Sequence, residues 1–159
     1  MLVLPELENR STESDRSFST LTRTLTLSRG CFCLLLVNCN CSETQKQAIQ
    51  KLSKTYNIQK LIIPKSAKSL YDLIQAKVAA RGELNKISPL SALCICGLES
   101  VRSLDELLQD TNFMRDRFAA NFPFPLIFWV TDEVHKKLIR LAPDFENIAT
   151  SGISFVPGP

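Results

Sequence analysis

Three largely apolar runs of strand length constrain the fold of this chain more than any other feature. They cover residues 31–38, 90–98 and 125–131, and none of them alternates regularly between apolar and polar residues. A strand has this pattern when helices cover both of its faces, as in a parallel sheet. Shorter runs at 60–64 and 152–156 predict two more strands, the last of them at an edge of the sheet.

Helical patterns occupy the segments between these runs. Apolar residues spaced by three and four follow Ser42, Ser69 and Ser103, and each serine has Gln, Asp or Glu three residues later. That arrangement is the capping box of a helix start. The pattern after Ser103 predicts one long helix that ends before Pro123.

Two further helices are predicted at the ends of this alternation. A stripe of Phe and Leu residues predicts a helix over 15–27, and Thr131 or Asp132 is expected to cap a short helix after the run at 125–131. Pro143 limits how far that short helix extends.

Strands that alternate with helices predict right-handed βαβ units. We therefore expect an α/β fold, a three-layer sandwich with a mainly parallel sheet of about five strands and helices on both faces. The chain has 159 residues, 45% of them hydrophobic, enough for one domain core. The predicted organisation is a loose arm over 1–14, a single α/β domain over 15–156 and a tail over 157–159.

Composition removes several classes of function. With five glycines and one histidine, the chain has few of the residues that phosphate-binding loops and acid–base catalysis use. Its longest apolar run is far shorter than the roughly 20 residues of a membrane-spanning helix. The N-terminus has no secretory signal pattern, so we expect a cytoplasmic protein. The six cysteines form three C-x-C pairs that favour reduced, buried thiols over a metal cluster, with Cys39 and Cys41 as the accessible exception.

The loop over 38–42 is the natural place for a phosphate, because ligands of parallel sheets lie beyond the carboxyl ends of the strands. It has no glycine, and its first lysine, Lys46, lies a full turn inside the following helix. Ser42 is therefore expected to be a helix N-cap, and the acids after the later strands are expected to be solvated loop and first-turn residues. A weak site for ATP with magnesium would use Asn38, Asn40, Ser42, Glu99 and Asp132.

Two other surfaces have a possible binding role. Six lysines against one glutamate between Glu43 and Tyr71 form either a solvated face or an RNA-binding surface, but no aromatic residues alternate with them. The stiff FPFP segment is mostly core, and it could expose Phe124 as a contact for a neighbouring domain.

Several segments resemble the N-terminal α/β domain of cyanobacterial tetratricopeptide-repeat and related repeat proteins. They are LLLVNCN (34–40), LCICGLESV (93–101), TNFMRDRF (111–118), FPFPLIFWVTDEV (122–134) and LIRLAPDF (138–145). The resemblance implies a P-loop-NTPase-like fold, commonly without the phosphate-binding lysine. The family usually has a tryptophan soon after the APDF motif, where this chain has residues 146–148, and it continues into helical repeats, whereas this sequence stops at VPGP.

We therefore expect a non-catalytic protein-interaction or regulatory domain, with protein partners or repeat domains and no cofactor. Its candidate interaction surface comprises Phe124, Asp144 and Phe145. A weak nucleotide-binding switch is the alternative, and a basic RNA-binding module is the third hypothesis. We expect no membrane partner and no small-molecule substrate.

Overall fold

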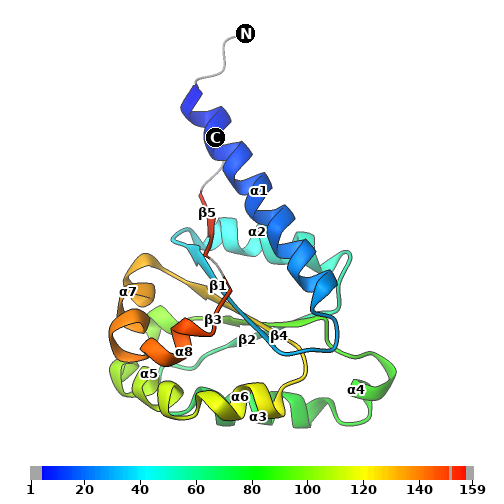
Figure 1. The fold of residues 1–159 in the computed structure, drawn as a ribbon, viewed down its shortest axis with the longest axis vertical. Helices are drawn as coiled ribbons and strands as arrows, with labels where there is room; N and C mark the ends of the chain where they lie inside the picture. The colour runs from blue at the N-terminus through cyan, green and yellow to red at the C-terminus, as the bar shows by residue number, and fades with distance from the viewer. Residues whose placement is uncertain (1–4, 151, 157–159) are drawn as a thin grey trace.

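The computed structural model describes residues 5–150 and 152–156 and contains one five-stranded sheet (Figure 1). Every strand pairing is parallel, and the order across the sheet is β2-β3-β4-β1-β5. The strands are β1 (Cys33–Cys39), β2 (Ile58–Ile62), β3 (Ala92–Cys96), β4 (Pro125–Val130) and β5 (Ile153–Phe155). The predicted parallel sheet with β5 at one edge is confirmed.

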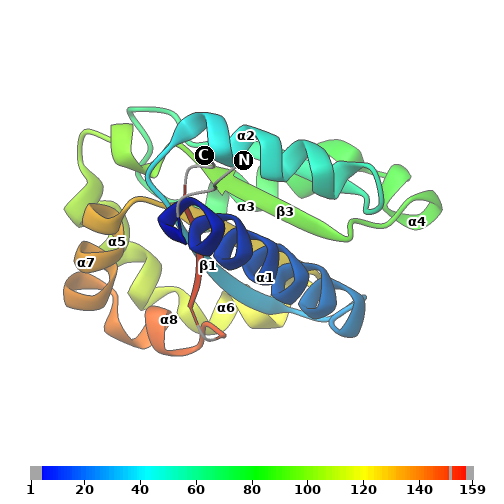
Figure 2. The ribbon, with the colours of Figure 1, turned by 90° about the horizontal axis from the view of Figure 1, so that it is seen from above.

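Helices cover both faces of the sheet, which confirms the three-layer sandwich (Figures 1 and 2). The described helices are α1 (Pro5–Leu27), α2 (Ser42–Ser53), α3 (Leu70–Arg81), α4 (Leu84–Ile87), α5 (Leu104–Phe113), α6 (Arg115–Asn121), α7 (Asp132–Leu141) and α8 (Pro143–Asn147), with a 3₁₀ turn at Leu98–Ser100. α1 and α2 pack on one face, and α3 and α5 to α8 pack on the other. Among the described helices, none combines the length and the apolar content needed to cross a bilayer.

Alternate residues of each central strand enter two separate cores. In β1, Leu34 and Leu36 face the α3 and α5 to α8 layer, while Leu35 and Val37 face α1 and α2. β3 and β4 alternate in the same way, and all of their residues are buried. Because successive side chains of a strand point to opposite faces, a strand covered on both sides must be apolar throughout. That requirement explains the apolar runs in the sequence.

The first helix starts earlier than predicted. α1 begins at Pro5, so the expectation of a loose arm is wrong for residues 5–14, and residues 1–4 and 157–159 lie outside the described residues. The side chains of Ser14 and Ser17 donate hydrogen bonds to the backbone carbonyls of Val156 and Ser154. These bonds join the helix to the last strand, far away in the sequence, and no local pattern indicates such a contact.

The predicted long helix after Ser103 is two helices. α5 ends at Phe113, and α6 begins at Arg115 after a break at Met114. The Arg115 guanidinium donates to the backbone carbonyl of Asn112 at 2.9 Å, and this carbonyl lies in the last turn of α5. The apolar stripe continues across the break, because Phe118 and Phe122 enter the same core, and so the stripe alone could not reveal it.

The thiols are placed partly as expected. Cys94 and Cys96 are buried in the core beneath α1 and α2, and burial raises their pKa values to about 12 and about 11. The expectation that Cys39 is accessible is wrong, because its side chain, on the buried strand β1, is only 5% exposed. Cys41 is half-buried. Cys31 is exposed, so the expectation that it is buried is also wrong.

We predict that Phe145→Ala destabilises the domain by about 3 to 5 kcal/mol, because a fully buried aromatic side chain leaves a cavity. The Phe145 ring packs at 5.0 Å from that of Phe118 and at 5.5 Å from that of Phe128, centroid to centroid. The matched control is Phe113→Ala, whose side chain is 82% exposed, and it should change stability by less than about 0.5 kcal/mol. Urea unfolding of both variants measures the difference, and equal effects would contradict this packing.

Candidate functional site

β1 and β4 meet at the point of the sheet where this class of fold usually holds a ligand. They are neighbours, but the chain leaves β1 for α2 on one face and leaves β4 for α7 on the other. Such a switch point opens a crevice beyond the carboxyl ends of the strands. Asn38 pairs with Val130 in the β1–β4 ladder, so the residues two positions further on, Asn40 and Asp132, lie opposite each other.

Two reciprocal hydrogen bonds join Asn40 and Asp132 at the carboxyl ends of these strands. The Asn40 amide nitrogen donates to the Asp132 carboxylate at 2.9 Å, and the backbone N–H of Asp132 donates to Asn40 Oδ1 at 2.9 Å. One residue earlier, Thr131 Oγ1 accepts from the backbone N–H of Val134 at 3.3 Å, which confirms Thr131 as the predicted cap. Side chains of the protein therefore accept from two backbone N–H groups in the first turn of α7, which could otherwise bind an anion.

The start of α2 differs from the prediction by one residue. Cys41 is the N-cap, and Ser42 is the first helical residue, because the Cys41 carbonyl accepts the first intrahelical bond from the Gln45 N–H at 3.1 Å. The capping box predicted for Ser42 is therefore wrong, and Ser103, although it is the N-cap of α5, makes no side-chain cap bond either. Hydrogen bonds from the Thr44 hydroxyl and from the backbone N–H groups of Thr44 and Glu43 lower the pKa of the Cys41 thiol.

These residues do not fit a triphosphate with magnesium. Of the five nucleotide-site candidates, the structure joins Asn40 and Asp132 directly, while Ser42 begins α2 beside them and Asn38 lies half-buried in β1. Glu99 is exposed on the 3₁₀ turn after β3 and lines a separate cavity. A phosphate at the switch point would approach the Asp132 carboxylate, which repels it. The lysine nearest in sequence to the 38–42 loop, Lys46, lies one helical turn inside α2.

Acidic residues outnumber basic ones in the lining of the cavity beside the switch point. It has a volume of about 400 Å³ and lies between the 3₁₀ turn, the start of α5 and the start of α7. Lys137 donates to Asp105 at 2.9 Å, and this bond lowers the pKa of the Asp105 carboxyl. The charged lining residues are Glu99, Arg102, Asp105, Glu106, Glu133 and Lys137, so four acids stand against two bases. This balance disfavours a phosphate ligand.

A cavity of different character lies at the other end of the strands, where their amino ends form what we call the amino edge of the sheet. It has a volume of about 390 Å³ and is lined by residues that come just before β1, β3 and β4, together with residues of α3 and α4. They are Arg29, Gly30, Val78, Asn85, Pro89, Leu90, Ser91, Pro123 and Phe124. We call it the amino-edge cavity. Phe124 was expected to project as an exposed contact, and that expectation is wrong, because its side chain is only 5% exposed and forms part of the cavity wall.

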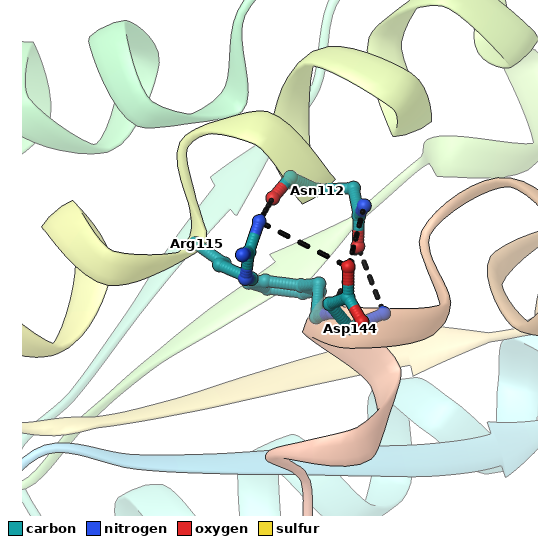
Figure 3. Close-up of polar contacts among 4 residues, drawn as sticks. Asn112, Arg115 and Asp144 are labelled. Carbon is teal, nitrogen blue, oxygen red and sulfur yellow. Dashed lines mark hydrogen bonds and ion pairs between the residues drawn. The ribbon is translucent and has the colours of Figure 1, made fainter.

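The other two candidates for the interaction surface belong to a structural contact (Figure 3). Asn112 Oδ1 accepts hydrogen bonds from the backbone N–H groups of Asp144 and Phe145 at 2.9 and 3.0 Å, and so caps α8. The exposed Asp144 carboxylate lies 4.0 Å from the Arg115 guanidinium. Phe145 is fully buried, so its predicted place on an interaction surface is wrong.

Sequence reasoning missed Asn112 and α8. Pro143 was interpreted as the limit of the preceding helix, but it is the first residue of α8, a position that suits proline because the N–H it lacks would have no intrahelical partner. The proline was therefore a usable signal. The Asn112 cap had no local signal, since 32 residues separate it from Asp144.

No family model matches the chain, and no curated protein sequence matches it either. The resemblance to the N-terminal domain of repeat proteins therefore stays an expectation. The structure defines the class of fold, an α/β sandwich with a five-stranded parallel sheet.

We predict that Asn112→Ala destabilises the domain by about 1 kcal/mol, because α8 loses the side chain that caps its first turn. Asn147→Ala, at the exposed other end of the same helix, is the control and should have an effect near zero. Chemical unfolding of the two variants tests the cap, and equal stabilities would contradict it.

We also predict that iodoacetamide at pH 7 modifies Cys41 much faster than Cys94 or Cys96. The lowered pKa of Cys41 keeps more thiolate at neutral pH and sustains its reaction at lower pH than an unperturbed thiol would allow, while the pKa values of the other two keep them protonated. Peptide mapping by mass spectrometry measures each rate.

Thr44→Val is the control for this prediction, because it removes the hydroxyl that stabilises the Cys41 thiolate while keeping the branched shape of the side chain. The pKa of Cys41 should then rise and its rate at pH 7 should fall. An unchanged rate would contradict the role of Thr44.

Proposed function

We propose that this chain is a non-catalytic protein-interaction domain of the cytoplasm, and that its partner contacts the amino edge of the sheet. The observation that carries the proposal is the Asn40–Asp132 pair, which spans the crevice where a fold of this class would hold a nucleotide. At the carboxyl ends of β1 and β4, these polar groups therefore hydrogen-bond to each other within the protein.

The amino edge offers apolar surface instead. In the described part of the chain, seven large hydrophobic side chains are exposed, and three of them flank the amino-edge cavity in sequence. They are Leu27 at the end of α1 and Leu84 and Ile87 on α4. Exposed apolar side chains around an apolar cavity are typical of a protein-binding surface.

The weak nucleotide-binding switch is the second candidate, and it has one observation in its favour. The first turn of α2 is exposed at Ser42 and lies at the same end of the sheet as Asn40 and Asp132. The acids around it make binding of a phosphate unfavourable.

The RNA-binding hypothesis has less support. Its six lysines are distributed over α2, the turn after it, β2 and the loop after β2. The Lys51 ammonium lies 4.2 Å from the centre of the Phe18 ring, in a contact within the protein. The lysines therefore come from separate elements, and one of them already has a partner.

We predict that magnesium ATP, titrated to about 5 mM, leaves the midpoint of thermal unfolding unchanged relative to sodium chloride at equal ionic strength, because a ligand of the folded state would raise it with concentration. The controls are Ser42→Ala and Glu99→Gln, which should behave like the unmodified protein. A midpoint that rises with ATP and no longer rises in these two variants would overturn the proposed function in favour of the switch.

A further inference from the structure

We propose that the amino-edge cavity binds the apolar C-terminal side chain of a partner protein, and that Arg29 holds the terminal carboxylate next to it. The inference rests on the proposed function and adds the chemistry of the partner. It places recognition at the amino ends of the strands, opposite the switch point where ligands of such sheets usually lie.

The cavity has the size and lining of a pocket for a side chain. Its volume of about 390 Å³ falls within the roughly 300 to 1,000 Å³ of typical ligand pockets. Five of its nine lining residues are apolar, namely Val78, Pro89, Leu90, Pro123 and Phe124. Gly30, at φ +75°, holds the turn before β1 in a left-handed conformation, and a Cβ placed there would have no atom within 4 Å, so this side of the cavity is open.

Arg29 is the one charged residue in the lining, and in the described part of the chain its side chain has neither an ion pair nor a hydrogen bond. The other polar groups are already engaged. Asn85 accepts from Arg81 Nε at 2.6 Å and donates to the Val78 carbonyl at 3.0 Å, and Ser91 Oγ accepts from the Asn57 N–H at 3.1 Å. The Arg29 guanidinium therefore keeps its donors for a ligand, and a planar carboxylate is the group that fits them best.

The charge around the cavity favours an acidic partner over a basic one. The segments 28–32 and 78–91 carry three basic residues, Arg29, Arg81 and Lys86, against one acid, Glu83. The cavity beside the switch point has the opposite balance, with four acids and two bases. An acidic segment is thus attracted to the amino edge and repelled from the other edge.

The surroundings of the cavity indicate a protein segment rather than a small molecule. Figures 1 and 2 place α4 and the C-terminal end of α1 at the same end of the sheet. Leu27, Leu84 and Ile87 on these helices are 79%, 48% and 81% exposed. A small ligand inside the cavity would leave them in water, whereas a peptide chain that continues beyond the cavity can cover them.

Fluorescence anisotropy with three labelled octapeptides tests the inference. The first ends in Leu-Phe with a free carboxylate, the second is identical with a C-terminal amide, and the third is amidated and has an aspartate directly after an internal Leu-Phe. We expect the free acid to bind about tenfold more tightly than the amide, as for a charged hydrogen bond of moderate strength. Weak binding of the third peptide supports a C-terminal carboxylate, and binding as tight as that of the first would overturn it in favour of an internal acid.

Three variants locate the interaction. Arg29→Gln should bind the free acid only as weakly as the amide, because the cation that distinguishes them is gone. Val78→Trp fills the cavity and should bind none of the peptides. Lys46→Gln removes the same charge from the exposed start of α2, near the other end of the strands and outside the cavity lining, and should bind like the unmodified protein. Circular dichroism checks that each variant is folded. Because Arg29 is exposed, the Arg29→Gln variant should fold and tests the inference even if Val78→Trp does not fold.

Equal affinity of the unmodified protein for acid and amide would overturn the role of Arg29, as would an unchanged preference in Arg29→Gln. Absence of binding by all three peptides at about 1 mM would overturn the site itself. The ATP titration tests the carboxyl ends of the strands, so absence of peptide binding would overturn the amino-edge site alone, whereas a response to ATP would overturn the non-catalytic role.

Discussion

The register of β1 on β4 is the constraint on which the rest of the structure depends. Six consecutive residue pairs, from Cys33 with Pro125 to Asn38 with Val130, join the two strands at the centre of the sheet. Both strands alternate between two cores, so a shift by one residue would exchange the sides of every side chain and bury the wrong set. The same register brings Asn40 opposite Asp132, and thereby determines what occupies the switch point.

The two edges of the sheet differ because of this geometry. At the carboxyl edge, the Asn40–Asp132 pair and the Thr131 cap use the polar groups that a phosphate would need, and acids predominate in the neighbouring cavity. At the amino edge, the segments before three strands leave a cavity with an apolar lining and one free cation among the described lining residues. A fold that commonly binds ligands at one edge thus presents its accessible apolar surface at the other.

The sequence was sufficient to predict the elements whose signals are local. Continuous apolar runs predicted the buried strands, and Ser69 and Thr131 cap α3 and α7 as expected. Two errors, at the start of α2 and at Pro143, concern local signals, and others came from contacts between distant segments. The bonds of Ser14 and Ser17 to the segment around β5 accompany the early start of α1, and the Asn112 cap of α8 depends on a residue 32 positions away. Burial of Phe124, just before β4, and of Phe145, in the short helix α8, likewise follows from packing between elements, because a single aromatic residue has the same local pattern whether it is buried or exposed.

The most direct test of the central claim is a map of amide chemical-shift changes in the ¹⁵N-labelled protein on titration with the free-carboxylate peptide. The account predicts changes concentrated at the amino edge, in the segments around Arg29, Leu90 and Phe124, with the amides of Asn40 and Asp132 unmoved. Changes concentrated around Asn40 and Asp132, with the amino edge unmoved, would contradict it.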